Sequence, residues 1–129
     1  METKTEEIKN LKVGSYVLLE GEACRVTNIQ RSAPGKHGHP KIRLEGVGIF
    51  DNQKRVIVKP AHERMTVPII DKRGGQVIAI MGDRVQIMDL SDYNTFETSI
   101  PDELKGKLTE GDQVVYWKFG ERCLLKGKK

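Results

Sequence analysis

The sequence predicts an all-β protein made of two small barrels. Short apolar segments that alternate with polar residues recur along the whole chain, and glycine-rich turns separate them. One polar stretch, interrupted by proline, divides the 129 residues into two halves of similar length. Segments of this length and spacing are typical of small closed or strongly bent sheets.

The first half contains four segments with strand character. Cys24–Ile29 and Lys41–Val47 alternate with the period of two that marks a half-buried strand. The polar residues Glu20–Glu22 form a turn before the first of them. The expected strands are Tyr16–Leu19, Cys24–Ile29, Lys41–Val47 and Lys54–Val58. This set predicts a bent barrel of the SH3-like kind, in which the segment after Ile29 joins two neighbouring strands.

A break follows the fourth of these strands. Lys59–Arg64 is polar and contains Pro60, and an extended pattern resumes at Thr66–Ile70. Pro68 has no N–H to donate to a strand ladder, so no central strand is expected to cross it. We therefore expect one domain over residues 1–68 and a second over residues 69–129.

The second half contains its own series of strands and one helical signal. The expected strands are Ile69–Lys72, Gln76–Met81, Arg84–Leu90, Thr95–Ile100, Gln113–Phe119 and Arg122–Leu125. Gly74-Gly75 and Gly82-Asp83 are expected to form hairpin turns. Pro101–Gly106 begins with proline and acids and ends with glycine, which predicts a short helix. Strands with one short helix before the last of them fit a five-stranded OB fold.

Composition indicates a folded protein of the cytoplasm with no membrane partner. Charged residues make up 31% of the chain and hydrophobic residues 37%. No apolar run approaches the roughly 20 residues that span a bilayer. Met1–Glu7 has no apolar signal core. Cys24 and Cys123 are far apart and form no CxxC pair, so we expect two buried thiols without a disulfide.

The net charge of +4 lies entirely in the first 68 residues, since residues 69–129 carry ten cations and ten acids. A positive field of this kind favours a polyanionic partner, most simply RNA phosphate. It is concentrated in the half that contains the segment Ser32–Lys41, which has two glycines, two prolines and no acid. Such a segment is a loop that adds nothing to a core, so we expect it to present its central residue, Lys36, to a partner.

The residues Gly35-Lys36-His37-Gly38-His39, with Lys41, resemble the modification loop of the translation initiation factor 5A family, the hypusine-containing factors. The similarity extends through Arg43–Phe50 and Thr66-Val67-Pro68, and the length suits the archaeal type. The resemblance implies that Lys36 receives an aminobutyl group from spermidine, giving deoxyhypusine or hypusine. Deoxyhypusine synthase would then be a partner, and no bound cofactor is expected.

The resemblance also implies a role on the ribosome. Family members bind beside peptidyl-tRNA, promote peptide-bond formation at stalled sequences such as consecutive prolines, and act in termination. The residues that we expect to shape the loop and to be recognised by the modifying enzyme are Gly35, His37, Gly38 and His39. Residues expected to contact RNA phosphate are Arg31, Lys41 and Arg43.

Other interpretations of these residues are weaker. Gly35-Lys36 is not a phosphate-binding P-loop, because Gln30 and His37 stand where that motif needs glycine and Ser or Thr. A third ligand for His37 and His39 would have to be His62 or a cysteine, and since neither is clearly placed, no metal site is expected. No catalytic signature is recognisable, although Lys36 could serve an enzyme as an amine nucleophile.

Two further alternatives stay open at this point. One is an unmodified two-barrel RNA-binding protein that acts outside the ribosome. The other concerns Tyr116 and Trp117, which lie in one predicted strand of the OB fold. Aromatic side chains on such a strand can stack on bases, but packing in the core is the more common role.

Overall fold

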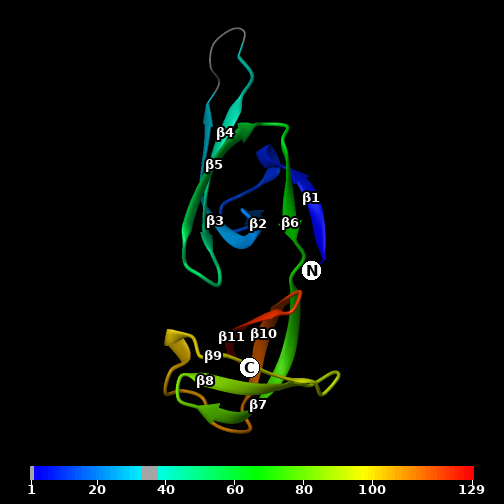
Figure 1. The fold of residues 1–129 in the computed structure, drawn as a ribbon, viewed down its shortest axis with the longest axis vertical. Helices are drawn as coiled ribbons and strands as arrows, with labels where there is room; N and C mark the ends of the chain where they lie inside the picture. The colour runs from blue at the N-terminus through cyan, green and yellow to red at the C-terminus, as the bar shows by residue number, and fades with distance from the viewer. Residues whose placement is uncertain (1, 33–37) are drawn as a thin grey trace. The chain divides into compact units, whose positions relative to one another are not determined.

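The structure, a computed structural model, describes residues 2–32 and 38–129. The chain divides into two compact units, Glu2–Ile69 and Ile70–Lys129 (Figure 1). All regular elements in the described ranges are strands or three-residue 3-10 turns, which confirms the all-β prediction with its two small curled sheets. None of the helical turns in these ranges has the length and hydropathy to cross a bilayer.

The first unit is built on one antiparallel sheet in the order β2-β3-β4-β5. Its strands are β2 (Tyr16–Leu19), β3 (Glu22–Ser32), β4 (Lys41–Gly48) and β5 (Lys54–Pro60). A separate pair, β1 (Thr3–Glu7) and β6 (Arg64–Pro68), and the 3-10 turn η1 (Ile8–Asn10) complete the unit. The alternation did not indicate β1, because its side chains are all polar and only its backbone pairing with β6 defines it.

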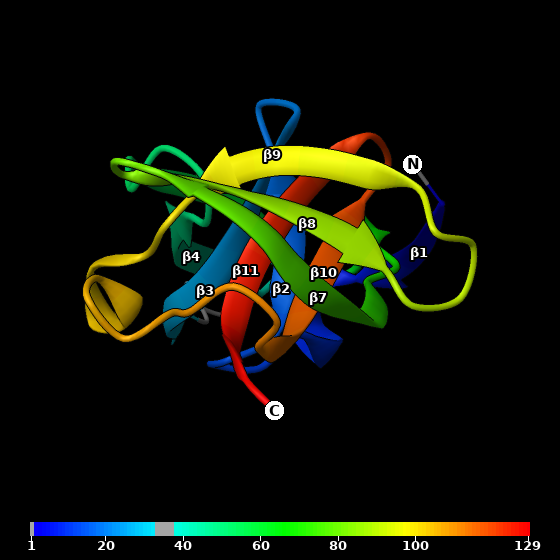
Figure 2. The same cartoon turned by 90° about the horizontal axis from the view of Figure 1, so that it is seen from below.

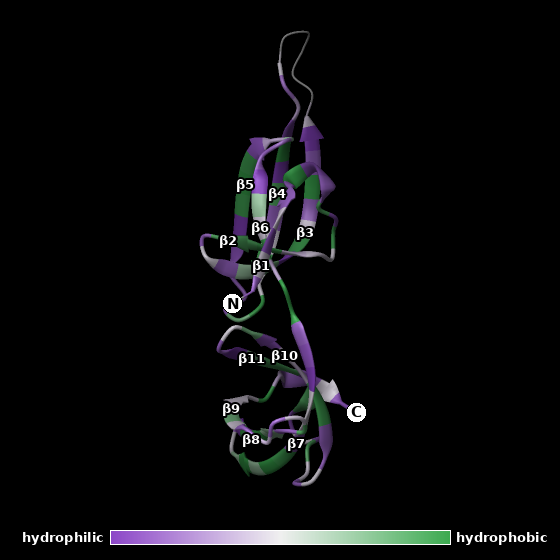
Figure 3. Cartoon of the chain, turned by 90° about the vertical axis from the view of Figure 1, so that its right-hand side faces the viewer, coloured by the Kyte–Doolittle hydropathy of each residue, from purple (hydrophilic) through white to green (hydrophobic). Residues whose placement is uncertain are grey.

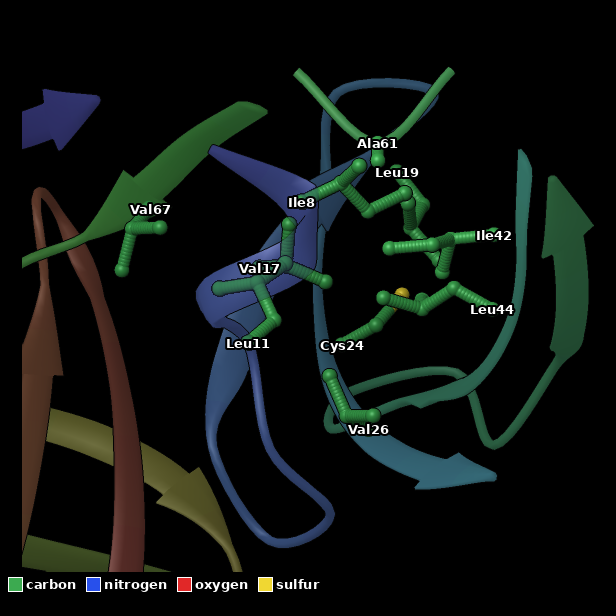
Figure 4. Close-up of a cluster of buried hydrophobic side chains, with 10 residues drawn as sticks. All are labelled: Ile8, Leu11, Val17, Leu19, Cys24, Val26, Ile42, Leu44, Ala61 and Val67. Atoms are coloured by element: carbon green, nitrogen blue, oxygen red, sulfur yellow. The ribbon is translucent and has the colours of Figure 1, made fainter. Parts of the chain in front are cut away.

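Alternation along β4 explains why this sheet has one buried face. Ile42 and Leu44 point into the core, whereas Lys41, Arg43 and Glu45 lie on the outer face. Figure 3 shows this pattern as alternating hydrophobic and hydrophilic bands along the strands. Ile8, Val17 and Leu44 come from three different elements and pack in one cluster (Figure 4). The rest of the cluster is Leu11, Leu19, Cys24, Val26, Ile42, Ala61 and Val67.

The second unit is a single five-stranded antiparallel sheet in the order β11-β10-β7-β8-β9. Its elements are β7 (Asp71–Met81), β8 (Arg84–Asp89), β9 (Thr95–Ser99), the 3-10 turn η2 (Asp102–Leu104), β10 (Gln113–Phe119) and β11 (Arg122–Lys128). The sheet curls until its edge strands β9 and β11 meet (Figure 2). There the Thr98 hydroxyl donates to the Cys123 carbonyl at 3.3 Å. This strand order and closure agree with the predicted five-stranded barrel.

The prediction of a hairpin turn at Gly74-Gly75 is wrong, because both glycines lie inside the continuous strand β7. Neither adopts a positive φ. A Cβ on Gly75 would stand 2.6 Å from Cγ2 of Ile87 on β8, so this glycine permits close approach of another strand. The second turn is confirmed: Gly82, at φ +65°, and Asp83 join the paired residues Met81 and Arg84.

The predicted helix over Pro101–Gly106 is present only as the 3-10 turn η2. Pro101 is its N-cap, with extended backbone, and is not its first helical residue. The two acids occupy the first turn, and Gly106 follows with a φ of +75°. The turn ends at Leu104, and eight residues separate it from β10.

Asp89, at the end of β8, joins three strands and a loop of the second unit. It is 2% exposed, and Nε of Arg73 on β7 donates to its Oδ2 at 2.7 Å. The hydroxyl of Tyr116 on β10 donates to the same oxygen. The backbone N–H groups of Ser91 and Asp92 donate to Oδ1 at 2.7 and 3.2 Å. The bonds from Arg73, with smaller contributions from Tyr116 and the backbone, hold the pKa of Asp89 far below its usual value despite burial.

Gly75 and Gly74 provide a matched pair for testing the close approach in β7. Gly75→Ala should lower the free energy of unfolding by about 1–3 kcal/mol, because the new methyl group overlaps Ile87. Gly74→Ala should change it by less than about 1 kcal/mol, since its Cβ would meet Leu90 at an ordinary 3.8 Å. Urea denaturation followed by fluorescence of the one tryptophan, Trp117 on β10, reports on this unit. If both variants lowered the free energy of unfolding equally, the close approach of Ile87 would not be the reason for a glycine at position 75.

Asp89→Asn should lower the free energy of unfolding of the second unit by about 2–3 kcal/mol at neutral pH, because it removes the buried carboxylate that accepts from both Arg73 and Tyr116, while Arg73 keeps its bonds to Asp71 and Asp92. The folded pKa of Asp89 is depressed, so its contribution is complete above the unfolded value near 4 and declines as pH falls below it. The gap between variant and parent should therefore shrink by about 1 kcal/mol between pH 6 and pH 3.

Asp102→Asn is the matched control for this measurement. Asp102 pairs with Lys105 at the surface, so the substitution should leave the tryptophan-detected transition almost unchanged. A gap between Asp89→Asn and the parent that is constant over this pH range would show that the Asp89 charge does not stabilise the fold.

Candidate functional site

The predicted site lies where the chain passes from β3 to β4. β3 ends at Ser32 and β4 begins at Lys41, so residues 33–40 connect two neighbouring strands of one sheet. Gly35, Lys36 and His37 lie outside the described residues. Gly38 and His39, which are described, are exposed and belong to no strand.

The two strands that flank this connection form the longest ladder of the first unit. It runs from Cys24 opposite Gly48 to Ser32 opposite Lys41. A β-bulge between Val26 and Asn28 shifts the register by one residue. The ladder continues to the last residues before the connection, so the two ends of the predicted loop start from adjacent backbones (Figure 1).

The three predicted RNA contacts do not share one face of this sheet. Arg31 pairs with Ile42, which is 1% exposed, and so lies on the core-facing side. Lys41 and Arg43 alternate with Ile42 and lie on the outer side. The bulge before Asn28 causes the difference, because it changes which residues of β3 face inward.

Arg43 is held by a neighbour on its own strand. Its Nη1 donates to Oε1 of Glu45 at 2.5 Å, and Nζ of Lys54 on β5 approaches Oε2 of Glu45 at 3.6 Å. The Arg43 hydrogen bond, more than any other influence, lowers the pKa of Glu45 below its usual value. The outer face therefore presents Arg43 and Lys54 beside one acid, Glu45, and Lys41 at the end of β4 nearest residues 33–40. Val56 and Val58 are exposed on β5.

Arg31 is exposed, and one of its guanidinium donors is engaged within the protein. Its Nη2 donates to the backbone carbonyl of Lys9 in η1 at 2.8 Å. This bond lies at the same end of the sheet as residues 33–40. The sequence did not reveal this contact, because Lys9 is 22 residues away and contributes only its backbone.

His62, considered above as a third metal ligand, has a different neighbour. Its Nδ1 lies 3.3 Å from Oε2 of Glu7, an oxygen that Lys9 also approaches at 3.2 Å. Across residues 2–32 and 38–129, no three His, Cys, Asp or Glu residues are grouped as metal ligands would be. His37 falls outside these ranges, so the histidine pair itself is not described.

The two aromatic residues of β10 have separate roles. Tyr116 is 3% exposed and packs in the core, with its ring 4.6 Å from that of Phe96. Trp117 is only partly buried, and the ammonium groups of Lys72 and Lys126 lie 5.0 and 4.3 Å from the centre of its ring. Core packing is therefore correct for Tyr116, whereas Trp117 lies on the opposite side of the strand.

A pocket of about 360 Å³ opens on the second unit. It is lined by Ile80, Gly82, Asp83, Ile100, Leu104, Lys105, Gly106 and Leu108. Lys105 is paired with Asp102 at 3.0 Å, which raises the pKa of its ammonium group. An apolar pocket with one acid and one paired lysine has no nucleophile with an adjacent base.

Comparison with known proteins identifies the family of both units. Residues 1–63 match the family described as translation initiation factor 5A-like, N-terminal. Residues 69–128 match the family described as eukaryotic elongation factor 5A hypusine, DNA-binding OB fold.

Individual relatives match over nearly their whole length. The chain is 57% identical to translation initiation factor 5A of Methanothermobacter thermautotrophicus, over 99% of each chain. It is 50% identical to the Thermococcus kodakarensis protein of that name, over 93% of this chain and 91% of the relative. Among solved structures, eukaryotic translation initiation factor 5A from Methanococcus jannaschii superimposes with a TM-score of 0.91 at 44% identity, covering 98% of this chain and 95% of that one. The chain therefore belongs to the translation initiation factor 5A family, with archaeal homologues at about half to three-fifths identity.

Proposed function

We propose that this chain is a ribosome-binding translation factor whose Lys36 is converted to deoxyhypusine or hypusine. The observation that carries the proposal is the sequence Gly35-Lys36-His37-Gly38-His39 between β3 and β4, in a chain whose family model is described by its hypusine. The family is one of translation factors and not of enzymes, so the alternative of Lys36 as a catalytic nucleophile is set aside.

The first proposed step, which forms deoxyhypusine, is a group transfer that balances without a net oxidant, whereas the hydroxyl of hypusine would require a separate oxidation by another enzyme. The 4-aminobutyl group of spermidine passes to Nζ of Lys36, so one C–N bond breaks and another forms. The proton lost by Nζ ends on the leaving amine, which departs as diaminopropane. Lys36 then carries a longer side chain with a second amine, both of which are protonated near neutral pH.

The modified side chain would act by position and charge. It could enter a cleft with RNA walls and donate hydrogen bonds to phosphate and ribose oxygens of peptidyl-tRNA. Holding the acceptor end of the tRNA reduces the freedom that must be lost before peptide-bond formation. The benefit would be largest where the nascent chain reacts slowly, as at consecutive prolines, and in termination. The ribosome supplies the chemistry, and the proposed site of action is the cytoplasm.

The outer face of β4 and β5 would guide the factor on RNA. Arg43 and Lys54 flank Glu45 there, Lys41 lies at the end of β4 nearest residues 33–40, and the unit that contains them carries all of the net positive charge. Glu45 opposes this charge, since it accepts from Arg43 and lies close to Lys54. We therefore assign Lys41 and Arg43 to phosphate contacts. Glu45 competes with phosphate for Arg43, because it already accepts a hydrogen bond from that guanidinium.

Lys36→Arg should abolish function in translation and leave the fold intact. Arginine retains the positive charge, but deoxyhypusine synthase cannot transfer the aminobutyl group to it. The variant should therefore fail to support growth of a strain depleted of the parent, with an unchanged melting temperature. Lys12→Arg, at an exposed lysine outside the proposed site, should support growth normally. Full rescue by Lys36→Arg would contradict the proposal and favour an unmodified RNA-binding protein.

Glu45→Gln should tighten binding to a single-stranded oligoribonucleotide by about two- to five-fold, because it releases Arg43 and Lys54 from their shared acid. Glu97→Gln is the matched control, since it changes the net charge equally and releases Arg84 in the second unit. Fluorescence anisotropy over a range of salt concentrations measures both affinity and its salt dependence. An equal gain from both variants would show that only net charge matters and that the β4–β5 face is not special.

A further inference from the structure

β3 has an incompletely paired edge on the side away from β4. β2 pairs with it only from Glu22 to Arg25. The turn before β2 adds two backbone bonds at Val26, from Gly14 and to Ser15, both 2.8 Å long. Beyond Val26, none of the described strands pairs with this edge. The part of β3 that leads to residue 33 is therefore supported by backbone pairing on one side only.

Arg31 supplies a contact on that edge. It lies on the core-facing side of β3, is exposed, and donates from Nη2 to the carbonyl of Lys9 in η1 at 2.8 Å. η1 is itself fixed, because Ile8 is fully buried and its N–H donates to the Glu63 carbonyl at 2.8 Å. The acceptor for Arg31 is thus a rigid part of the first unit.

The contact continues to the other end of the loop. The Lys9 N–H donates to the carbonyl of Ala61 at 3.2 Å, and the Ala61 N–H donates to the carbonyl of Pro40 at 3.0 Å. We call Arg31, Lys9, Ala61 and Pro40 the loop-base chain. Its three hydrogen bonds connect β3, just before residues 33–37, to the residue that precedes β4. Pairing of Ser32 with Lys41 completes the ring around the base of the hairpin.

We propose that Arg31 is a positioning residue for the modification of Lys36 and not a contact to RNA phosphate. The inference rests on the proposed function, because it takes modification of Lys36 as given. An enzyme that encloses Lys36 must bind its flanking segment in one conformation, and a hairpin with both ends fixed loses less freedom on binding. A guanidinium suits this role, because its donors are held in a rigid planar fork.

Loss of the Arg31 hydrogen bond should affect recognition by the modifying enzyme, and this effect can be measured separately from protein stability and from the chemical step. Loss of the Arg31 bond lowers the fraction of molecules whose hairpin base is in the competent arrangement. Apparent affinity for the modifying enzyme falls by that fraction, whereas the chemical step on bound protein is unchanged. Arg31 therefore affects KM for the protein substrate, and kcat stays as in the parent.

The test uses the full chain, deoxyhypusine synthase and radiolabelled spermidine. Arg31→Ala should raise KM for the protein about three- to ten-fold with kcat unchanged and a melting temperature within a few degrees of the parent. Arg31→Lys, which keeps one flexible donor, should recover part of the loss. An unchanged KM for Arg31→Ala would overturn the inference, as would a lowered kcat with KM as in the parent. Failure of the parent itself to be labelled would instead refute the proposed function.

RNA binding gives the second readout. Lys41→Ala, at an exposed residue of the outer face, should reduce the salt dependence of binding to a single-stranded oligoribonucleotide by nearly one counterion. Arg31→Ala should leave that dependence as in the parent if the guanidinium, which is exposed but donates to the Lys9 carbonyl, serves the loop base and not phosphate. A reduction equal to that of Lys41→Ala would show that Arg31 contacts phosphate and would overturn the inference.

Discussion

The antiparallel pairing of β3 with β4 is the contact on which the first unit depends. Its inner side supplies Cys24, Val26, Ile42 and Leu44 to the core, and its outer side carries the basic residues of β4. The same ladder ends at Ser32 and Lys41, where the segment with Lys36 begins and ends. Packing and site are therefore coupled: a change of register by one residue would exchange the faces and move the cations into the core.

The bulge between Val26 and Asn28 shows how this ladder divides its charges. Simple alternation from Val26 would place Arg31 on the outer face with Arg43. The extra residue instead turns Arg31 inward, where it braces the hairpin base through Lys9, and leaves Lys41 and Arg43 outside. One local irregularity thus separates cations that hold the loop from cations that can reach a partner.

In the second unit, the single carboxylate of Asp89 has two structural roles, since it closes a loop and joins three strands.

The sequence predicted the elements whose side chains define them. Tyr16–Leu19 and Gln113–Phe119 were expected at the bounds where they are found, because their alternation reflects a buried and an exposed face. β1 was missed, because it is held by backbone pairing that polar side chains do not report. Gly74-Gly75 was misassigned to a turn, because a strand approached closely by Ile87 requires glycine for a different reason. The site residues followed from a local motif, whereas the role of Arg31 depended on a bulge and on a carbonyl 22 residues away.

Lys36 is proposed to carry a spermidine-derived group that the rest of the first unit positions. Tandem mass spectrometry of the full chain, purified from cells that make it naturally, tests this most directly. The account predicts that the peptide containing Lys36 is heavier by one aminobutyl group, with or without an added hydroxyl, and that fragment ions assign the addition to Lys36. An unmodified Lys36, or the same addition on another lysine, would contradict it.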